Sequence, residues 1–175
     1  MFGIRKITAV LALLAALSVG AADVKLPIKM TDLAERFKHS CPGNVKISVQ
    51  GDTLVISLAE ADRKGGFEGA YALNLKKLAG KRMTVMIDVK ISDVDHAGNV
   101  PSTVGRMFFG ESVQNLTTRY TGWHTYTFKS VKIPGNGMLK MRVSLKNLSG
   151  EIQIRNPHVK VDIPKPPKKK KKKKN

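Results

Sequence analysis

The chain has 175 residues, of which 31 are Lys or Arg and 13 are Asp or Glu, and its net charge is +18. Its single cysteine, Cys41, excludes an internal disulfide, so the fold has to rest on an apolar core. The excess of positive charge favours contact with polyanions and leaves the fold class open.

The N-terminal segment has the three parts of a secretory signal peptide. A basic pair, Arg5-Lys6, precedes an apolar run at 7–19 that is too short to span a membrane, and small residues follow at 20–22. We predict cleavage after this segment and export to the periplasm, the cell surface or the medium. The alternative is an uncleaved membrane anchor. Export would exclude a cytosolic nucleic-acid binder.

Residues 31–37 carry the one helical pattern in the predicted exported part. Leu33, Ala34 and Phe37 form a short apolar stripe, and either Thr31 or Asp32 is suited to cap the helix N-terminus. We expect this helix to cover one end of the domain.

Most of the remaining chain alternates between apolar and polar residues, as strands with one buried face do. Residues 45–50 and 54–58 alternate on either side of Gly51-Asp52, which predicts a β-hairpin. Residues 83–91 and 139–145 show the same period, so each predicts a strand with one face in the core.

The last predicted strand changes its parity once. Ile152 and Ile154 share one parity, while Val159 and the following apolar residues share the other. The slip predicts a bulge or bend at Asn156-Pro157, which keeps both halves facing inward.

Strands joined by short turns, without helices between them, predict an all-β fold with two antiparallel sheets packed face to face. The predicted organisation is a signal peptide at 1–22, one β-sandwich domain at 23–163 and a disordered Pro/Lys tail at 164–175.

Two stretches carry a family resemblance. The motifs are Gly51-Asp52-Thr53-Leu54-Val55-Ile56, residues 71–75 and 78–81 leading into 85–90, and then Gly122-Trp123-His124-Thr125-Tyr126-Thr127-Phe128, Ile133-Pro134, 139–145 and 150–154. Their order resembles the carbohydrate-binding-module jelly rolls of the galactose-binding-like superfamily. The resemblance implies a jelly-roll sandwich and a polysaccharide or other glycan as the ligand.

Sugar sites need flat aromatic faces surrounded by hydrogen-bonding groups. Phe67 and Tyr71 follow a glycine-rich turn, and Tyr120 precedes the strand that begins near Trp123. These four residues are the candidate carbohydrate contacts. The alternative for the first three is packing at the rim of the sandwich, and for Trp123 it is a structural anchor packed against the sandwich, as the resemblance implies.

His124, Tyr126 and Phe128 share one side of a predicted strand. One side of that strand has to face the core, so these three residues cannot all be exposed ligand contacts.

The segment 93–99 places oxygen ligands at alternate positions, as calcium loops do. However, Ala97 occupies the third ligand position and Val104 stands where a bidentate Glu belongs. We therefore expect an inter-strand loop and no cofactor, with a structural calcium ion as the alternative.

No catalytic motif assembles from the sequence. The four histidines have neither zinc-site nor HExxH spacing, and nucleophile elbows and phosphate loops are absent. Asp88 and Glu111 could form a glycosidase pair only if the fold brings them together. We expect the protein not to be an enzyme.

The C-terminal tail combines prolines with a run of seven lysines, and such a segment does not fold. The predicted polyanion contacts are Lys168, Lys169, Lys170, Lys171, Lys172, Lys173 and Lys174. Without the tail lysines and the signal-peptide charges, 21 basic residues face 13 acidic ones, a net charge of +8. The tail would tether the protein to an anionic envelope polymer or lipid surface; the alternative is a solubilising segment.

Together these features predict an exported, non-catalytic module that binds carbohydrate or another cell-envelope polymer. The alternative is a structural or adaptor protein of the envelope whose sandwich binds protein partners.

Overall fold

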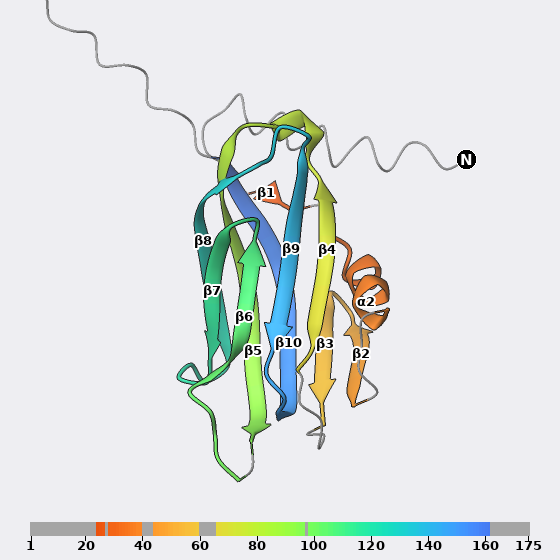
Figure 1. The fold of residues 1–175 in the computed structure, drawn as a ribbon, viewed down its shortest axis with the longest axis vertical. Helices are drawn as coiled ribbons and strands as arrows, with labels where there is room; N and C mark the ends of the chain where they lie inside the picture. The colour runs from red at the N-terminus through yellow and green to blue at the C-terminus, as the bar shows by residue number, and fades with distance from the viewer. Residues whose placement is uncertain (1–23, 27, 40–43, 60–65, 97, 162–175) are drawn as a thin grey trace, which may run out of the picture.

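The computed structural model describes residues 24–26, 28–39, 44–59, 66–96 and 98–161. Two antiparallel β-sheets pack face to face in this part of the chain (Figure 1), so the predicted all-β sandwich is confirmed. The signal peptide, Cys41 and the polylysine tail lie outside the described residues. Among the helices in the described ranges, none has the length and apolar character needed to cross a membrane.

The larger sheet has the strand order β2-β3-β10-β5-β8, and β1 pairs with β10 beside this path. The strands of this sheet are β1 (Val24–Lys25), β2 (Val45–Gln50), β3 (Thr53–Leu58), β5 (Arg82–Asp95), β8 (Trp123–Lys132) and β10 (Ser149–Val161). β10 lies at the centre, where it pairs with β3 on one side and β5 on the other. β2 and β8 are therefore the two edges.

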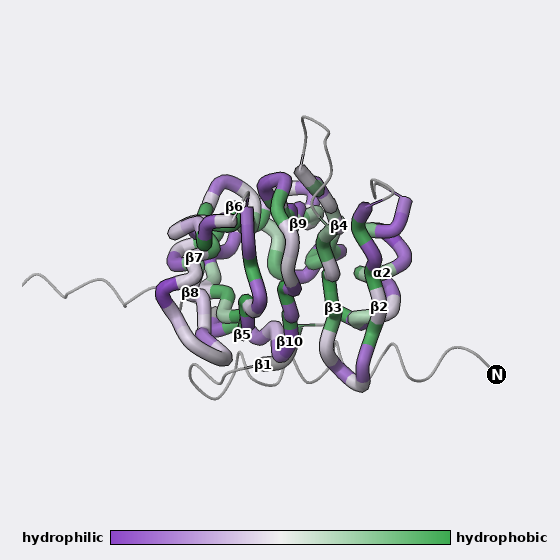
Figure 2. Tube along the Cα trace, turned by 90° about the horizontal axis from the view of Figure 1, so that it is seen from below, coloured by the Kyte–Doolittle hydropathy of each residue, from purple (hydrophilic) through white to green (hydrophobic). Residues whose placement is uncertain are grey.

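The smaller sheet has the order β4-β9-β6-β7. Its strands are β4 (Glu68–Asn74), β6 (Thr103–Phe109), β7 (Ser112–Thr117) and β9 (Met138–Leu145), and a short 3-10 helix, η1 (Lys76–Leu78), leads from β4 towards β5. Viewed along the strands, the two sheets form two layers (Figure 2). The chain passes repeatedly from one sheet to the other, as in a jelly roll.

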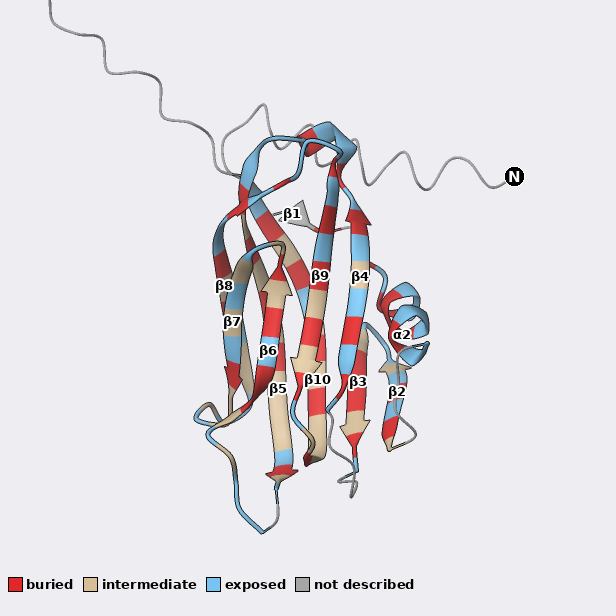
Figure 3. Ribbon diagram, in the orientation of Figure 1, coloured by how far each residue is buried: buried red, intermediate tan, exposed pale blue. Residues whose placement is uncertain are grey.

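The predicted alternation is confirmed in the strands that form the core. Met83, Val85, Ile87 and Val89 on β5 are at most 1% exposed, whereas the residues between them are intermediate. Buried and exposed positions alternate along β9 and β4 as well (Figure 3). The side chains between the sheets exclude water from a single continuous core, which is the main source of stability in a domain of this size.

Two predicted local features are also confirmed. β2 and β3 pair as a hairpin in which Val45 lies opposite Leu58. On β10, the register with β5 shifts between Arg155 and His158, and Asn156 has a φ of 50°. This bulge lets β10 keep an apolar face towards the core on both sides of the bend.

The predicted helix is present as α2 (Met30–Lys38), and its apolar stripe is buried. The predicted capping by Thr31 or Asp32 is wrong. The helix begins at Met30, and its N-cap residue, Lys29, makes no side-chain capping hydrogen bond. The position expected for the helix, at one end of the domain, is also wrong.

α2 instead lies along one long side of the sandwich, where it contacts the edge strands β2 and β4 (Figure 1). It thereby closes the opening between the two sheets on that side. The fit is close at Gly69 of β4, where an added Cβ atom would lie 2.7 Å from the Phe37 ring, so only glycine is accommodated there. The opposite long side is bounded by the edge strands β8 and β7, with no helix over it in the described residues.

Candidate functional site

A groove lies between β7 and β8, on the long side of the sandwich opposite α2; we call it the lateral groove. Its volume is about 520 Å³, a size suited to a small ligand. Its lining combines aromatic rings with amides, hydroxyls and one guanidinium: Thr103, Gln114, Asn115, Thr117, Arg119, Tyr120, His124, Thr125, Tyr126 and Thr127.

Side chains join the two sheets across this groove. Gln114 Nε2 donates a hydrogen bond of 3.0 Å to the backbone oxygen of Thr127. The backbone N–H of Thr117 donates to Tyr126 Oη at 3.1 Å. Burial raises the pKa of the Tyr126 phenol above its usual value, and the hydrogen bond from Thr117 opposes this shift. The Tyr126 hydroxyl is therefore a neutral structural group at physiological pH.

Three aromatic rings are clustered at one end of the groove. The Tyr120 and His124 rings are stacked, with centroids 3.5 Å apart and planes 7° from parallel. Tyr126 meets the His124 ring edge-on at 4.9 Å. The Arg119 guanidinium carbon lies 5.1 Å from the Tyr120 centroid. His124 covers one face of Tyr120, and the exposed Arg119 side chain lies over the ring, where a ligand that stacks on the other face would contact it.

This combination suits a sugar ring. The apolar face of a pyranose stacks on an aromatic ring, while its hydroxyls need amide and hydroxyl partners around the edge. The half-buried ring of Tyr120 provides the first feature. The exposed side chains of Asn115 and Thr125, together with Thr103, provide the second.

Of the four predicted carbohydrate contacts, only Tyr120 lines the lateral groove. Phe67 is 1% exposed and packs edge-on against Phe37 of α2, with ring centroids 5.6 Å apart. The structure therefore corrects the prediction that Phe67 presents an exposed face, because α2 covers this position.

Tyr71 lies on the α2 side of the sandwich, far from the lateral groove in the order of strands, because β4 and β7 are opposite edges of one sheet. It is half-buried and packs against the core. Burial raises the pKa of its phenol, and the nearby carboxylate of Asp32 adds to the effect, while Arg36 opposes it. This environment agrees with the alternative interpretation of Tyr71 as rim packing.

Trp123 is half-buried and belongs to neither the core nor the lateral groove. It lies opposite Lys90 in the β8–β5 register, and the Arg155 guanidinium carbon lies 3.8 Å from the centroid of its ring. Arg155 also approaches Asp88, with Nε 3.9 Å from Oδ2. Trp123 therefore lies outside the buried core, and one face of its indole is already occupied by a cation.

The prediction that His124, Tyr126 and Phe128, on one side of β8, cannot all be exposed ligand contacts is confirmed. Phe128 is 0% exposed and Tyr126 is 5% exposed, while His124, nearest the start of the strand, is half-buried. The inward side of this strand thus passes from the core into the lateral groove. Sequence reasoning did not assign His124, Tyr126, Gln114 or Arg119 to a site. The only available signal was the proximity of Arg119 to Tyr120 in the chain.

The two acidic candidates lie in different sheets. Asp88 is on β5 of the larger sheet, and Glu111 is in the turn between β6 and β7 of the smaller one. Asp88 accepts hydrogen bonds from Thr125 Oγ1 at 2.7 Å and Asn156 Nδ2 at 3.3 Å. Its carboxylate therefore has structural partners on two neighbouring strands.

The segment 93–99, expected as an inter-strand loop with a calcium site as the alternative, includes the end of β5 and the turn that follows. Asp95 Oδ2 accepts a hydrogen bond from the backbone N–H of Gly98 at 3.1 Å, so this carboxylate stabilises the turn. In the described residues, no group of three or more His, Cys, Asp or Glu side chains is placed to hold a metal ion.

No family model matches the sequence, and no curated protein matches it. Solved structures of carbohydrate-binding modules, the proteins that the sequence resembles, do match the fold. A family 4 module is 15% identical over 67% of this chain and 78% of that chain, with a TM-score of 0.45. An unliganded module of BiXyn10A is 18% identical over 82% and 98%, with a TM-score of 0.45.

The family 11 module of the cellulosomal cellulase Lic26A-Cel5E of Clostridium thermocellum is 15% identical over 67% of this chain and 81% of that chain, with a TM-score of 0.41. Identities and TM-scores this low leave the function to be inferred from this chain's own side chains. Placement in the galactose-binding-like superfamily stays a prediction.

Proposed function

We propose that this chain is an exported, non-catalytic carbohydrate-binding protein whose glycan ligand lies in the lateral groove. The observation that carries the proposal is the arrangement around Tyr120: an aromatic ring stacked on His124, with the Arg119 guanidinium carbon 5.1 Å from its centroid. Amides and hydroxyls line the rest of a groove of about 520 Å³.

The position of the groove supports this role. The two long sides of the sandwich differ, because α2 covers only the side bounded by β2 and β4 among the described residues. On the other side, the hydrogen bonds made by Gln114 and Thr117 hold β7 and β8 together while leaving polar side chains accessible. A rigid, partly polar groove is preorganised, which lowers the entropy lost on binding.

The places of the two acidic candidates within the described residues favour binding without turnover. Asp88 is hydrogen-bonded and paired on the outer face of the larger sheet, and Glu111 lies in a turn of the smaller sheet. Neither carboxylate lines the lateral groove, where the stacked rings of Tyr120 and His124 lie.

Export and attachment complete the proposal. The signal peptide would deliver the domain to the envelope, and the lysines at 168–174 would hold it against an anionic polymer or lipid surface. The sandwich would then supply selectivity, and the tail would supply retention.

A glycan array probed at low and high salt tests the proposal. Tyr120→Ala should abolish binding to neutral glycans because it removes the stacking face, and Tyr71→Ala is a matched control of the same residue type on the opposite long side of the sandwich. Both variants should first be shown to fold. Binding that persists in Tyr120→Ala and is lost in Tyr71→Ala would move the site to the α2 side. If the unmodified protein binds no glycan, or only acidic glycans that wash off at high salt, the protein-binding adaptor would be favoured instead.

A further inference from the structure

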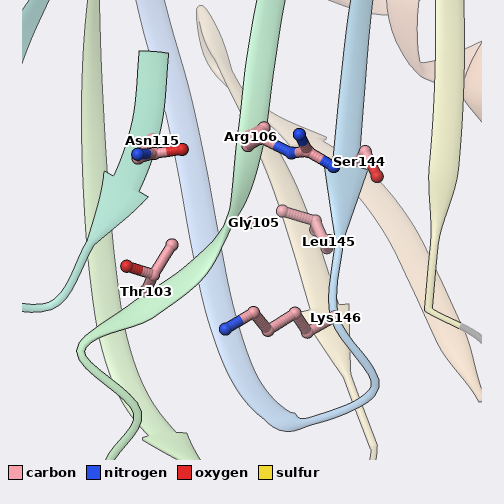
Figure 4. Close-up of a pocket in the computed structure, with 7 residues that line it drawn as sticks. All are labelled: Thr103, Gly105, Arg106, Asn115, Ser144, Leu145 and Lys146. Atoms are coloured by element: carbon pink, nitrogen blue, oxygen red, sulfur yellow. The ribbon is translucent and has the colours of Figure 1, made fainter.

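A second, smaller hollow adjoins the lateral groove. It is formed by residues of β6, β7 and β9 and the residue that follows β9, and has a volume of about 330 Å³ (Figure 4). Its lining shares Thr103 and Asn115 with the lateral groove. A chain-like ligand that occupies the groove would therefore have its next unit beside this hollow.

The hollow is bordered by two cations. Arg106 lies on one rim with its guanidinium directed towards β9, and Lys146 lies on the other with its amine directed towards β6 (Figure 4). Gly105 and Leu145 lie between them and contribute no polar side chain. The two positive charges thus point across the same small space from neighbouring strands.

These cations lack neutralising partners within the described residues. The lining of the hollow contains no carboxylate. On the same sheet Arg142 is paired with Glu68 at 3.9 Å, whereas Arg106 and Lys146 have no ion pair in the described part of the chain. The Arg106 guanidinium carbon lies 5.8 Å from the centroid of the Phe108 ring, which is a distant cation–π contact.

The remaining lining groups are those that recognise sugars. The hydroxyls of Thr103 and Ser144 and the amide of Asn115 can donate to and accept from ring hydroxyls. A hollow near the lower size limit of ligand pockets, with neutral hydrogen-bonding groups between two cations, fits one sugar ring that bears an anionic group.

We infer that the hollow bounded by Arg106 and Lys146 binds an acidic sugar unit, so that the ligand of the lateral groove is an acidic glycan bearing carboxylate or sulfate groups. This inference rests on the proposed function, since it assigns a second subsite of the same binding site. Arg106 forms charge-assisted hydrogen bonds with the anionic group, and Lys146 contributes a point charge from the opposite rim.

The test uses short, chemically matched probes with the full chain. One probe is a polyuronate oligosaccharide, the second is the same oligosaccharide after reduction of its carboxyl groups to neutral alcohols, and the third is a sulfated oligosaccharide of similar length. Dissociation constants are measured by calorimetry at two salt concentrations. The unmodified protein should bind at least one acidic probe roughly tenfold or more tightly than the neutral one, and this preference should persist at the higher salt.

The informative variant is Arg106→Gln/Lys146→Gln. It should reduce affinity for the acidic probe by at least about tenfold and leave affinity for the neutral probe within about twofold. Lys140→Gln is the matched single-charge control on the outer face of the same sheet, about 20 Å along β9 from Lys146 at 3.3 Å per residue. All variants keep the polylysine tail, so its contribution is common to every measurement.

Four outcomes would overturn the inference. Equal binding of the acidic and neutral probes would show that the hollow does not select charge, and this result leaves the proposed function intact. A loss in Lys140→Gln equal to that in the double variant would assign the effect to net charge. Tighter binding of a single-stranded oligonucleotide than of any glycan, lost in the double variant, would assign the cations to nucleic acid. A failure of every glycan to bind would refute both proposals.

Discussion

The backbone N–H of Thr117 donates a hydrogen bond to Tyr126 Oη, and this bond joins the edge strand of the smaller sheet to the edge strand of the larger one. The two strands belong to different sheets and share no backbone ladder. A side-chain hydroxyl therefore fills the role of a missing strand partner at the free edge of β7 and closes the sandwich beside the lateral groove.

Tyr126→Phe should lower the free energy of unfolding by about 1 kcal/mol, because it leaves a partly buried N–H without its partner while keeping the ring in place. Urea unfolding followed by circular dichroism measures the change. Tyr120→Phe, which removes a hydroxyl from a neighbouring ring, is the control and should have little effect. Equal stabilities of the unmodified protein and Tyr126→Phe would show that the bond adds nothing measurable.

Stability should fall above pH 10. The pKa of Tyr126 in the folded state lies above the unfolded-state value of 10.0, chiefly because of burial, so the native state holds this proton longer than the unfolded state. The contribution is complete below pH 10 and is lost as the pH rises through the folded-state pKa. Melting temperatures between pH 8 and 11 should therefore decline less steeply in Tyr126→Phe. Parallel curves for the two proteins would contradict this origin.

Core and surface positions on the same strands should respond very differently to charge. Ile87 and Val143 are both 0% exposed, so replacing either by Asp would bury an unpaired carboxylate and should unfold the domain. Lys90→Asp and Lys140→Asp reverse charges outside the core and should change the free energy of unfolding by at most about 0.5 kcal/mol. Thermal melts of the four variants check this. Similar losses of stability in the core variants and the surface variants would show that the assigned inward and outward faces of these strands are wrong.

Removal of residues 168–174 should weaken binding to anionic vesicles or polymers and flatten its dependence on salt. Each lost contact with nucleic acid would reduce the log–log slope by roughly 0.7–0.9, and contacts with sparser polymers should count for less. The melting temperature should not change, because the prolines before the lysine run separate it from the folded domain. A salt titration of vesicle binding for the full and shortened chains measures the slope. Identical slopes would show that the lysine run makes no contact, and that any attachment comes from basic residues outside the tail.

Local sequence patterns were sufficient to predict the features that depend only on residues close together in the chain. The period of two on β5 and β9 predicted their buried faces, because successive side chains of a strand point to opposite sides whatever the strand pairs with. The slip near Asn156-Pro157 predicted the bulge on β10 for the same reason. Tyr120, predicted as a carbohydrate contact because it precedes a strand, lies in the lateral groove.

The tertiary arrangement decided which candidates could meet a ligand. Phe67 and Tyr120 look alike in the sequence, as aromatic residues near strand ends, yet α2 covers one and leaves the other in the lateral groove. The capping prediction for α2 failed for a related reason. The helix begins at Met30, whose buried side chain packs on the sandwich, and no polar side chain caps its N-terminus.

The sequence by itself determined the two-sheet character, the strand faces and the basic charge, since these follow from residue type and period along the chain. Only the tertiary structure decided that Gln114 would bond to Thr127 and Tyr126 to Thr117 across the two sheets, and that Arg106 and Lys146 would border one hollow. Strand order and the packing of α2 set these distances, and both depend on contacts between residues far apart in the chain, which a local pattern does not encode.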